Sequence, residues 1–373
     1  MKKIAIVLNS SWQAYNFRLN LARALKEYGY KVVFIAPYDK KYSDLLKNEF
    51  DFYNIDIDPK GINPINDFKT MISLYKLYHN ITPDLVLNFT IKPNIYSSLV
   101  AGILNIKAIS NISGLGTIFI KQSIITKIAK LLYKVALGIN SIVFFQNNDD
   151  KTLFIENNLV FKKKTDLLPG SGVDLNKFIP IEKEDDGVFR FLLIARLLKD
   201  KGILEFIDAI KMIKNKYYNV EFQILGAVGV ANKTAISNEE LSIWIDSGLV
   251  NYLGTTDNVQ SIIAKADCVV LPSYREGTPR SLLEACAMKK PIITTDVVGC
   301  KEVVDDCVNG YLCEVKNAKD LASKMEMMIN LPNKQRKKMG EAGRKKVINE
   351  FDENIVINKY LETIKEVLEK CYI

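Results

Sequence analysis

The sequence contains a single histidine, His79, among 373 residues. Because Ser-His-Asp catalysis and most zinc centres depend on histidine, the first is excluded and the second is disfavoured. The G-x-S-x-G motif of α/β-hydrolases is also absent. His79 lies near the polar end of a predicted helix with nothing anionic or nucleophilic around it, which is typical of an exposed helical residue.

Cysteine is sparse, and no two cysteines form a C-x-x-C pair. Several lie in apolar runs, as buried thiols do. The six are Cys268, Cys286, Cys300, Cys307, Cys313 and Cys371. The opening Met1-Lys2-Lys3 leads directly into Ile4–Leu8, which is too short for the apolar region of a signal peptide. Reduced cysteines without a signal peptide predict a cytoplasmic protein.

No apolar run approaches the roughly 20 residues that a membrane-spanning helix requires. The net charge of +8 suits an anionic membrane, a diphosphate or nucleic acid, but no RNA- or DNA-binding motif accompanies it, so nucleic acid is not expected. Residues 118–134 are apolar, carry four lysines and lack any acidic residue. Such a basic amphipathic helix either lies on an anionic membrane surface or packs on a sheet with a basic outer face.

Short apolar runs alternate with helical patterns along the whole chain. Strands are expected at Ile4–Leu8, Val32–Ala36, Leu85–Phe89, Ala108–Ile112, Ile142–Gln146, Phe189–Ala195, Val220–Leu225, Cys268–Leu271 and Ile292–Thr294. Helices are expected between them, for example at Asn16–Glu27, Ile65–Tyr78 and Asn94–Leu104. This alternation predicts an α/β fold with doubly wound parallel sheets.

The chain is too long for one typical core and suits two domains. The glycines of residues 169–172 and the charged residues 182–187 interrupt the alternation, so the hinge is expected near 170–186. We predict two Rossmann-like domains, 1–175 and 187–350, facing a cleft. A last helix follows within 351–373.

The most informative motif is Glu276-Gly277-Thr278-Pro279 followed, eight residues after the first glutamate, by Glu284. Thr278 suits a helix N-cap and Pro279 the first helical position. Side chains of a helix lean toward its N-terminus, so the Glu284 side chain is expected to reach the space in front of the helix start, where Glu276 lies. The helix start favours an anion, and glutamates accept hydrogen bonds from sugar hydroxyls. The motif therefore fits a nucleotide sugar, although strand–loop–helix segments with two glutamates also arise by chance.

Two cations follow an earlier strand, Phe189–Ala195. Arg196 and Lys201 stand after this strand and before a predicted helix, where open α/β sheets bind ligands. One fork-shaped and one point-like cation suit the two phosphates of a nucleotide diphosphate. Solvated basic residues at a helix start would give the same pattern. Neither the two cations nor the two glutamates are decisive alone, but the two motifs together are much more specific for a nucleotide sugar.

Arg196 and Lys201, followed by Glu276 and Glu284, resemble the donor site of family-4-type retaining glycosyltransferases of GT-B fold. The resemblance covers the whole chain and is nearest to bacterial enzymes of capsule, O-antigen and protein-glycan assembly. Further matching motifs are Tyr15-Asn16-Phe17-Arg18, Thr90-Ile91-Lys92-Pro93-Asn94, Gly114-Leu115-Gly116-Thr117, Phe145-Gln146-Asn147 and Pro169-Gly170-Ser171-Gly172-Val173-Asp174. Where many relatives carry a histidine, this chain has Asn88-Phe89-Thr90.

The resemblance implies transfer of a sugar, such as an N-acetylhexosamine, from a UDP donor to an undecaprenyl-diphosphate-linked sugar. Arg196 and Lys201 would hold the diphosphate, Glu276 the donor sugar and Glu284 the ribose. The donor loop would also include Gly277, Thr278 and Pro279. Acceptor-binding residues would be Lys92, Asn94, Gly114, Gly116 and Thr117. The last helix would cross back to the N-terminal domain, and the enzyme would lie peripherally on the inner membrane face.

No cofactor and no metal ion are expected. Asp56-Ile57-Asp58 matches the D-x-D pattern of metal-dependent sugar transferases, but it lies far in sequence from the donor motifs and is interpreted as the solvated end of a strand. Two other functions stay open. An epimerase acting on nucleotide sugars would need further acids or bases, and a sugar-nucleotide sensor would bind without turnover.

Overall fold

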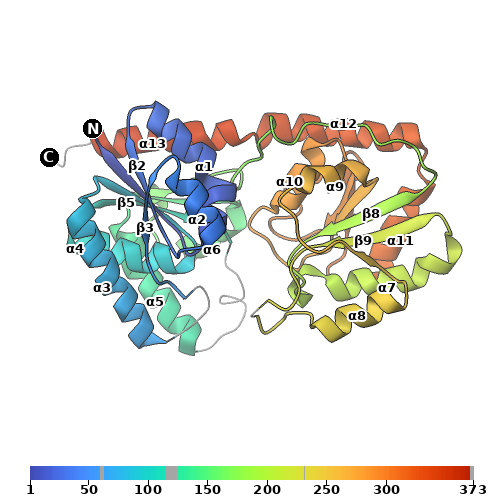
Figure 1. The fold of residues 1–373 in the computed structure, drawn as a ribbon, viewed down its shortest axis with the longest axis horizontal. Helices are drawn as coiled ribbons and strands as arrows, with labels where there is room; N and C mark the ends of the chain where they lie inside the picture. The colour runs from blue at the N-terminus through green and yellow to red at the C-terminus, as the bar shows by residue number, and fades with distance from the viewer. Residues whose placement is uncertain (59–62, 115–123, 231, 370–373) are drawn as a thin grey trace. The chain divides into compact units, whose positions relative to one another are not determined.

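The computed structural model describes residues 1–58, 63–114, 124–230 and 232–369. They form two compact units, each with its own parallel sheet and its own core (Figure 1). Unit 1 comprises Met1–Ser171 and the chain from Asn354 onward, and unit 2 comprises Gly172–Glu353. Within the described ranges, no helix is both long enough and apolar enough to cross a membrane.

Unit 1 is built on a seven-stranded parallel sheet in the order β3-β2-β1-β4-β5-β6-β7. The strands are β1 (Lys3–Val7), β2 (Lys31–Ala36), β3 (Asp51–Asn54), β4 (Leu85–Phe89), β5 (Lys107–Ile112), β6 (Ile142–Phe145) and β7 (Thr165–Leu167). The central strands are buried on both faces, which explains their continuous apolar sequences. The strand order reverses between β1 and β4.

Helices cover this sheet and bury their apolar stripes against it. They are α1 (Ser11–Glu27), α2 (Lys40–Lys47), α3 (Pro64–Ile81), the π-helical turn η1 (Pro93–Ser97), α4 (Ser98–Ile103), α5 (Ile124–Ile139), α6 (Asn148–Glu156), the 3₁₀ turn η2 (Lys162–Lys164) and α13 (Glu353–Glu369). The helix predicted at Asn94–Leu104 is confirmed as a helical segment, and its first part is the π-helical η1. There the buried Asn94 amide donates to the carbonyl of Asn111 at 2.8 Å.

Helix α13 belongs to unit 1, although its sequence follows unit 2. It packs into the same core cluster as α1, β1 and β4, with Tyr360 and Ile364 fully buried. The Tyr360 hydroxyl accepts a hydrogen bond from the Asn111 amide at 2.8 Å. Lys359 forms an ion pair with Asp166 at 2.7 Å. These contacts join the last helix to strands β5 and β7 of the sheet.

Unit 2 is built on a six-stranded parallel sheet in the order β10-β9-β8-β11-β12-β13. The strands are β8 (Phe189–Ile194), β9 (Val220–Leu225), β10 (Asn251–Tyr252), β11 (Cys268–Leu271), β12 (Ile292–Thr295) and β13 (Gly310–Cys313). This is the strand order of the dinucleotide-binding Rossmann fold. The prediction of two Rossmann-like parallel sheets is therefore confirmed.

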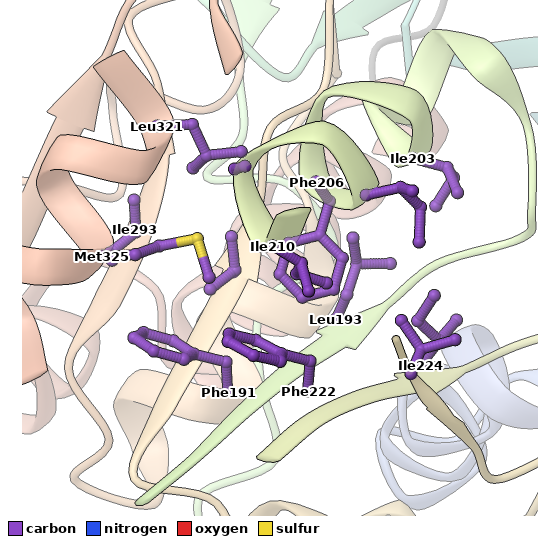
Figure 2. Packing of buried hydrophobic residues seen from close by; sticks show 14 of the residues in the cluster. Phe191, Leu193, Ile203, Phe206, Ile210, Phe222, Ile224, Ile293, Leu321 and Met325 are labelled. Carbon is purple, nitrogen blue, oxygen red and sulfur yellow. The ribbon is translucent and has the colours of Figure 1, made fainter. Parts of the chain in front are cut away.

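The helices of unit 2 enclose two apolar clusters, one on each face of the sheet. They are η3 (Lys199–Lys201), α7 (Ile203–Ile213), η4 (Lys214–Lys216), α8 (Asn238–Asp246), α9 (Val259–Lys265), α10 (Arg280–Ala287), α11 (Ala318–Asn330) and α12 (Asn333–Glu350). Figure 2 shows the larger cluster, where Phe206 and Ile210 of α7 lie over the strands. Beneath them Phe191 and Phe222 stack with ring centroids 5.8 Å apart. This packing fixes the position of α7 and of the loop before it.

Candidate functional site

The strand order of unit 2 reverses between β8 and β11, which are hydrogen-bonded neighbours. The loops that leave the carboxyl ends of these two strands diverge to opposite sides of the sheet, and ligands of open α/β sheets bind at such a point. The loop after β8 carries Arg196 and Lys201, and the loop after β11 carries Glu276. The structure therefore brings the two sequence motifs to one edge of one unit.

Close backbone packing holds these loops together. Gly202 adopts φ +72°, and a Cβ atom at this position would lie 2.0 Å from the carbonyl oxygen of Pro272. The carbonyl of Asp200 accepts hydrogen bonds from the Tyr274 amide at 2.9 Å and from the Ser273 hydroxyl at 3.2 Å. Only glycine fits at position 202, because any side chain would collide with the neighbouring backbone. The result is a fixed position for Lys201.

Lys201 Nζ forms an ion pair with Glu276 Oε1. The two side chains are 19% and 14% exposed, so the pair is largely shielded from water but still reachable. A third loop supports it, because the Glu276 amide donates to the Val298 carbonyl at 3.0 Å. Gly299 follows with φ +88°, and a Cβ there would lie 2.4 Å from the Glu276 carbonyl oxygen. The site thus holds a cation and a carboxylate in mutual contact.

Glu284 lies on α10 and forms a second ion pair, with Arg280 one turn earlier. Arg280 Nε donates to Glu284 Oε1 at 3.0 Å, and both side chains are under one fifth exposed. Burial raises the pKa of Glu284 above its usual value, while the charge and hydrogen bond of Arg280 oppose this rise. The carboxylate is held in place by one arginine and surrounded by little water. It is therefore a directed hydrogen-bond acceptor.

The predicted start of this helix is wrong by one residue. Pro279, with φ −74° and ψ 112°, occupies the N-cap, because α10 begins at Arg280. The Pro279 carbonyl accepts the first helical bonds, from Leu282 at 3.1 Å and Leu283 at 3.4 Å. The Glu276 amide is bonded to the Val298 carbonyl, the chain bends at Gly277 and Thr278, and Pro279 is extended. Gly277 and Thr278 form the link between Glu276 and α10.

Arg196 differs from Lys201 in its surroundings. Its side chain is exposed, and the described part of the chain offers it no ion pair. The neighbouring backbone is closely packed, since a Cβ on Gly226 would lie 1.8 Å from the Ala195 carbonyl oxygen. The guanidinium therefore projects from a fixed backbone and is available to an anion.

Two residues that the sequence analysis did not single out complete this site. Arg280 is the partner of Glu284, and its spacing of four residues within a helix could have identified it. Tyr274 donates its hydroxyl hydrogen to Glu205 Oε1 of α7 at 2.6 Å. Burial, reinforced by Glu205, raises the pKa of Tyr274. This bond joins the loop after β11 to helix α7, two segments distant in sequence, so no local pattern predicts it.

The acceptor residues predicted from resemblance lie in unit 1, at the ends of β4 and β5. Lys92 forms an ion pair with Asp67 of α3, with both side chains under one fifth exposed. Asn94 is buried and bonds to the end of β5. Gly114 has φ +121°, a conformation that favours glycine. Gly116 and Thr117 lie outside the described residues.

Unit 1 also places unsatisfied polar atoms at its own strand-order reversal. Val7 of β1 pairs with Asn88 of β4, and Asn9 and Thr90 each lie two residues beyond this pair. Asn9 Oδ1, Thr90 Oγ1 and Asn94 Oδ1 are buried and have no hydrogen-bond partner among the described residues. Thr90 also adopts φ +73°, which is rare for a residue other than glycine. Buried oxygens of this kind are suited to hydroxyl or amide donors of a ligand.

Metal ligands are not gathered in the described ranges, where no group of three or more His, Cys, Asp and Glu residues could hold an ion. The tract Asp56-Ile57-Asp58 begins two residues after the end of β3, and Ile57 is buried.

Comparison with known families covers both units. Residues 3–147 match the family described as "Glycosyl transferase 4-like", and residues 175–346 match "Glycosyl transferases group 1". The two matches lie one in each unit and together span most of the chain.

Similar proteins match over nearly their whole length. The N,N'-diacetylbacillosaminyl-diphospho-undecaprenol alpha-1,3-N-acetylgalactosaminyltransferase of Campylobacter jejuni is 27% identical, over 98% of this chain and 99% of that protein. The UDP-Gal:alpha-D-GlcNAc-diphosphoundecaprenol alpha-1,3-galactosyltransferase of Escherichia coli is 28% identical, over 83% and 81%. Anabaena HepE, crystallised with UDP-glucose, has a TM-score of 0.79 at 18% identity, over 98% and 100% of the two chains.

Proposed function

The chain belongs to the family-4-type glycosyltransferases, and on this premise we propose that it transfers a sugar from a UDP donor to an undecaprenyl-diphosphate-linked sugar with retention of anomeric configuration. The donor sugar proposed is an N-acetylhexosamine such as GalNAc. The Campylobacter relative, named for transfer to a diphospho-undecaprenol sugar and similar along almost the whole chain, supports this acceptor. Assembly of a surface polysaccharide or glycan would be the setting, on the inner face of the cell membrane.

The observation that carries the proposal is the cluster at the strand-order reversal of unit 2. Two cations, Arg196 and Lys201, follow β8, and two carboxylates lie at α10, Glu276 before its start and Glu284 within it. Lys201 contacts Glu276, and Arg280 contacts Glu284. A nucleotide sugar offers two phosphates between two groups of hydroxyls, and this arrangement of charges matches it.

Each residue then has a distinct role. Arg196 and Lys201 neutralise the diphosphate, and the backbone of Gly277, Thr278 and Pro279 faces the phosphates or the donor sugar. Glu284, oriented by Arg280, accepts hydrogen bonds from the ribose hydroxyls. Glu276 leaves Lys201 when the donor binds and accepts hydrogen bonds from hydroxyls of the transferred sugar. The ion pair of Lys201 and Glu276 is thus replaced by two contacts with the donor.

The reaction needs no protein base. An acceptor hydroxyl attacks the anomeric carbon from the face on which the diphosphate departs, the bond between that carbon and the phosphate oxygen breaks, and the departing oxygen takes the acceptor proton. Charge develops on the diphosphate, where Arg196 and Lys201 stabilise it. The remaining contribution is orientation of the two sugars.

The acceptor is proposed to bind unit 1. Lys92 and the loop of Gly114, Gly116 and Thr117 would meet the acceptor's diphosphate and sugar. The unsatisfied oxygens of Asn9, Thr90 and Asn94 are supporting observations, because sugar hydroxyls would supply the missing donors.

The test is a donor screen against undecaprenyl-diphosphate monosaccharides. We expect one UDP-N-acetylhexosamine to yield a lipid-linked disaccharide with an α linkage, identified by mass spectrometry and NMR. Epimerised UDP-sugar without a disaccharide would indicate an epimerase, and tight UDP-sugar binding without any product would indicate a sensor. Either outcome would overturn the proposal.

A further inference from the structure

Trp12 lies at the edge of unit 1 where the strand order reverses. It occupies the first turn of α1, five residues after the end of β1 and three residues after Asn9. The Cα–Cβ bonds of a helix tilt toward its N-terminus, so the indole leaves α1 on the side of the sheet's carboxyl edge. A large aromatic side chain therefore stands beside the residues that follow β1.

The position of this indole is fixed by its neighbours. The hydroxyl of Ser11 donates to the carbonyl of Pro37, which follows β2, and so anchors the first turn of α1. The Trp12 carbonyl accepts a hydrogen bond from the side chain of Asn16 at 3.0 Å. The indole contacts the ring of Phe17 edge to face, with ring centroids 5.1 Å apart. Trp12 is thus an ordered aromatic surface rather than a loose side chain.

Trp12 is nevertheless 43% exposed. The other tryptophan of the chain, Trp244, is 9% exposed and fills the core of unit 2. A single exposed apolar residue is normal on a soluble protein, so the exposure of Trp12 alone marks no site. A second observation concerns the polar atoms next to it.

Three side-chain oxygens at this reversal have no hydrogen-bond partner among the described residues. Asn9 Oδ1 and Thr90 Oγ1 are buried atoms of residues that are themselves partly exposed. Asn94, which is 1% exposed, carries the third and lies one turn after Thr90, to whose carbonyl its amide donates at 3.0 Å. The amide oxygens of asparagine can only accept, so a ligand that satisfies them must supply O–H or N–H donors.

An aromatic surface next to hydrogen-bond acceptors matches a sugar ring. One face of a pyranose exposes C–H groups, which pack on an aromatic ring, while its hydroxyl and amide groups can donate from the rim. A diphosphate offers no donor to these oxygens, and an acyl chain offers no polar group at all. A nucleobase could also stack, but the cations suited to a nucleotide diphosphate, Arg196 and Lys201, lie in unit 2.

We propose that Trp12 is the stacking platform for the acceptor sugar, and that the oxygens of Asn9 and Thr90 accept hydrogen bonds from the hydroxyl or amide groups of that sugar. This inference rests on the proposed function and deepens it, because it states which part of the acceptor unit 1 reads. Trp12 contacts the sugar without taking part in bond making, so it is a specificity-determining residue.

The fluorescence of Trp12 tests this contact without turnover. Trp244→Phe leaves Trp12 as the one tryptophan of the chain. The probes are short-chain alkyl diphosphates carrying GlcNAc, GalNAc or N,N'-diacetylbacillosamine. At least one should shift the emission to shorter wavelength in a saturable way, because stacking removes the indole from water. The same alkyl diphosphate without a sugar, and UDP alone, should leave the emission unchanged. The difference between wild type and Trp12→Phe isolates the same signal without a change at Trp244.

Kinetics with the same water-soluble acceptors give an independent measurement. Trp12→Leu should raise the KM for the acceptor about tenfold, the loss expected when an aromatic contact of roughly 1.4 kcal/mol is removed. The kcat and the KM for the donor should stay unchanged, because the stack is equally strong in the ground state and the transition state. Trp12→Phe keeps an aromatic ring and should stay within about threefold of the wild type.

Tyr28→Leu is the matched control. Tyr28 is 51% exposed and stacks on Tyr30 at the other end of α1, away from the carboxyl edge of the sheet. This variant should have the acceptor KM of the wild type. All three exposed-site variants should keep their melting temperature and their UDP affinity, because neither Trp12 nor Tyr28 is part of a core.

The outcomes separate this inference from the proposed function. Emission that shifts with no sugar probe, or equally with the sugar-free diphosphate, would overturn the stacking role. An acceptor KM in Trp12→Leu that equals the KM of the Tyr28→Leu control would overturn it as well. If the wild type forms no product with any donor while its emission still shifts only with a sugar-bearing probe, the proposed function fails and the sugar contact stands.

Discussion

Lys201 and Glu276 form the central contact of the candidate donor site, and a double-mutant cycle measures what this contact does. The cycle compares the wild type with Lys201→Ala, Glu276→Gln and the double variant. Lys201→Ala leaves a carboxylate that is only 14% exposed without its cation. Adding Glu276→Gln removes that charge. We therefore expect the second change to cost less stability in the presence of the first.

The magnitude follows from the burial of the pair. Two unit charges about 4 Å apart attract by roughly 4 kcal/mol at an effective dielectric constant of about 20. Desolvation and side-chain ordering offset most of this, which leaves a coupling of about 1–2 kcal/mol. For a unit of this size, about 1 kcal/mol corresponds to a shift of roughly 2–4 °C in melting temperature. Lys201→Ala should lower the melting temperature by several degrees, and the double variant should recover part of that loss.

Nucleotide binding and turnover should respond differently to the two single changes. Lys201→Ala removes a diphosphate contact and should weaken transfer by about 10²-fold or more. Glu276→Gln removes the competitor of the diphosphate for Lys201, so UDP affinity should be kept or improved. Turnover should still fall by about 10²-fold, because a contact with the transferred sugar is lost. Calorimetry with UDP and single-turnover rates measure these quantities separately.

Two results would refute this reasoning. Strictly additive losses of stability would mean that the ion pair is absent in solution. Loss of UDP binding in Glu276→Gln, together with normal binding in Glu284→Gln, would mean that the two glutamates have exchanged roles.

Three further predictions concern the same site. Arg196→Ala should lower transfer by about 10²-fold. Unlike Lys201→Ala, it should leave the melting temperature unchanged, because the guanidinium is exposed and has no ion pair within the described residues. A melting temperature that drops as far as in Lys201→Ala would show that Arg196 supports the fold. Burial raises the pKa of Glu284, so on acidification this carboxylate should become protonated at a higher pH than an ordinary glutamate. UDP binding by the wild type should weaken with that protonation. Glu284→Gln should bind UDP more weakly at neutral pH, and its UDP affinity should not change with pH over this range. Activity should persist in excess EDTA, and complete loss that Mg²⁺ or Mn²⁺ restores would reveal a metal ion in the reaction.

The buried strands could be predicted closely from sequence. Leu85–Phe89, Val220–Leu225 and Cys268–Leu271 agree with the structure at both ends. Each has a paired strand on both sides, and most of its positions are buried and apolar. The fold class followed from these strands and from the helices between them.

The strands that the sequence analysis missed are the four at the edges of the two sheets. They are β3, β7, β10 and β13. Edge strands pair on one side only, and these are two to four residues long. The first three are polar and partly exposed, so their extended form depends on the neighbouring strand rather than on their own pattern.

The candidate site was predictable in its position but not in its internal contacts. The spacing of Arg196, Lys201, Glu276 and Glu284 indicated which strand ends carry charge. The pairing of Lys201 with Glu276 depends on two close approaches, of Gly202 to Pro272 and of Gly299 to Glu276, between segments far apart in sequence. The one-residue error at the start of α10 concerns the same loop, in which the bend at Gly277 and Thr278 and the extended Pro279 delay the helix to Arg280.

The position of α13 has a consequence for how the protein is made. Unit 1 needs residues from both ends of the chain, whereas unit 2 is continuous. A ribosome that has finished residues 1–171 has not yet made Tyr360 and Ile364, which fill the core beside α1. Until translation reaches them, part of the apolar surface of the nascent sheet stays uncovered and accessible to chaperones. Unit 2 is therefore synthesised completely before unit 1 is. A gene fragment encoding residues 1–171 alone should therefore yield an aggregation-prone product, and one that joins residues 354–369 to it should express better.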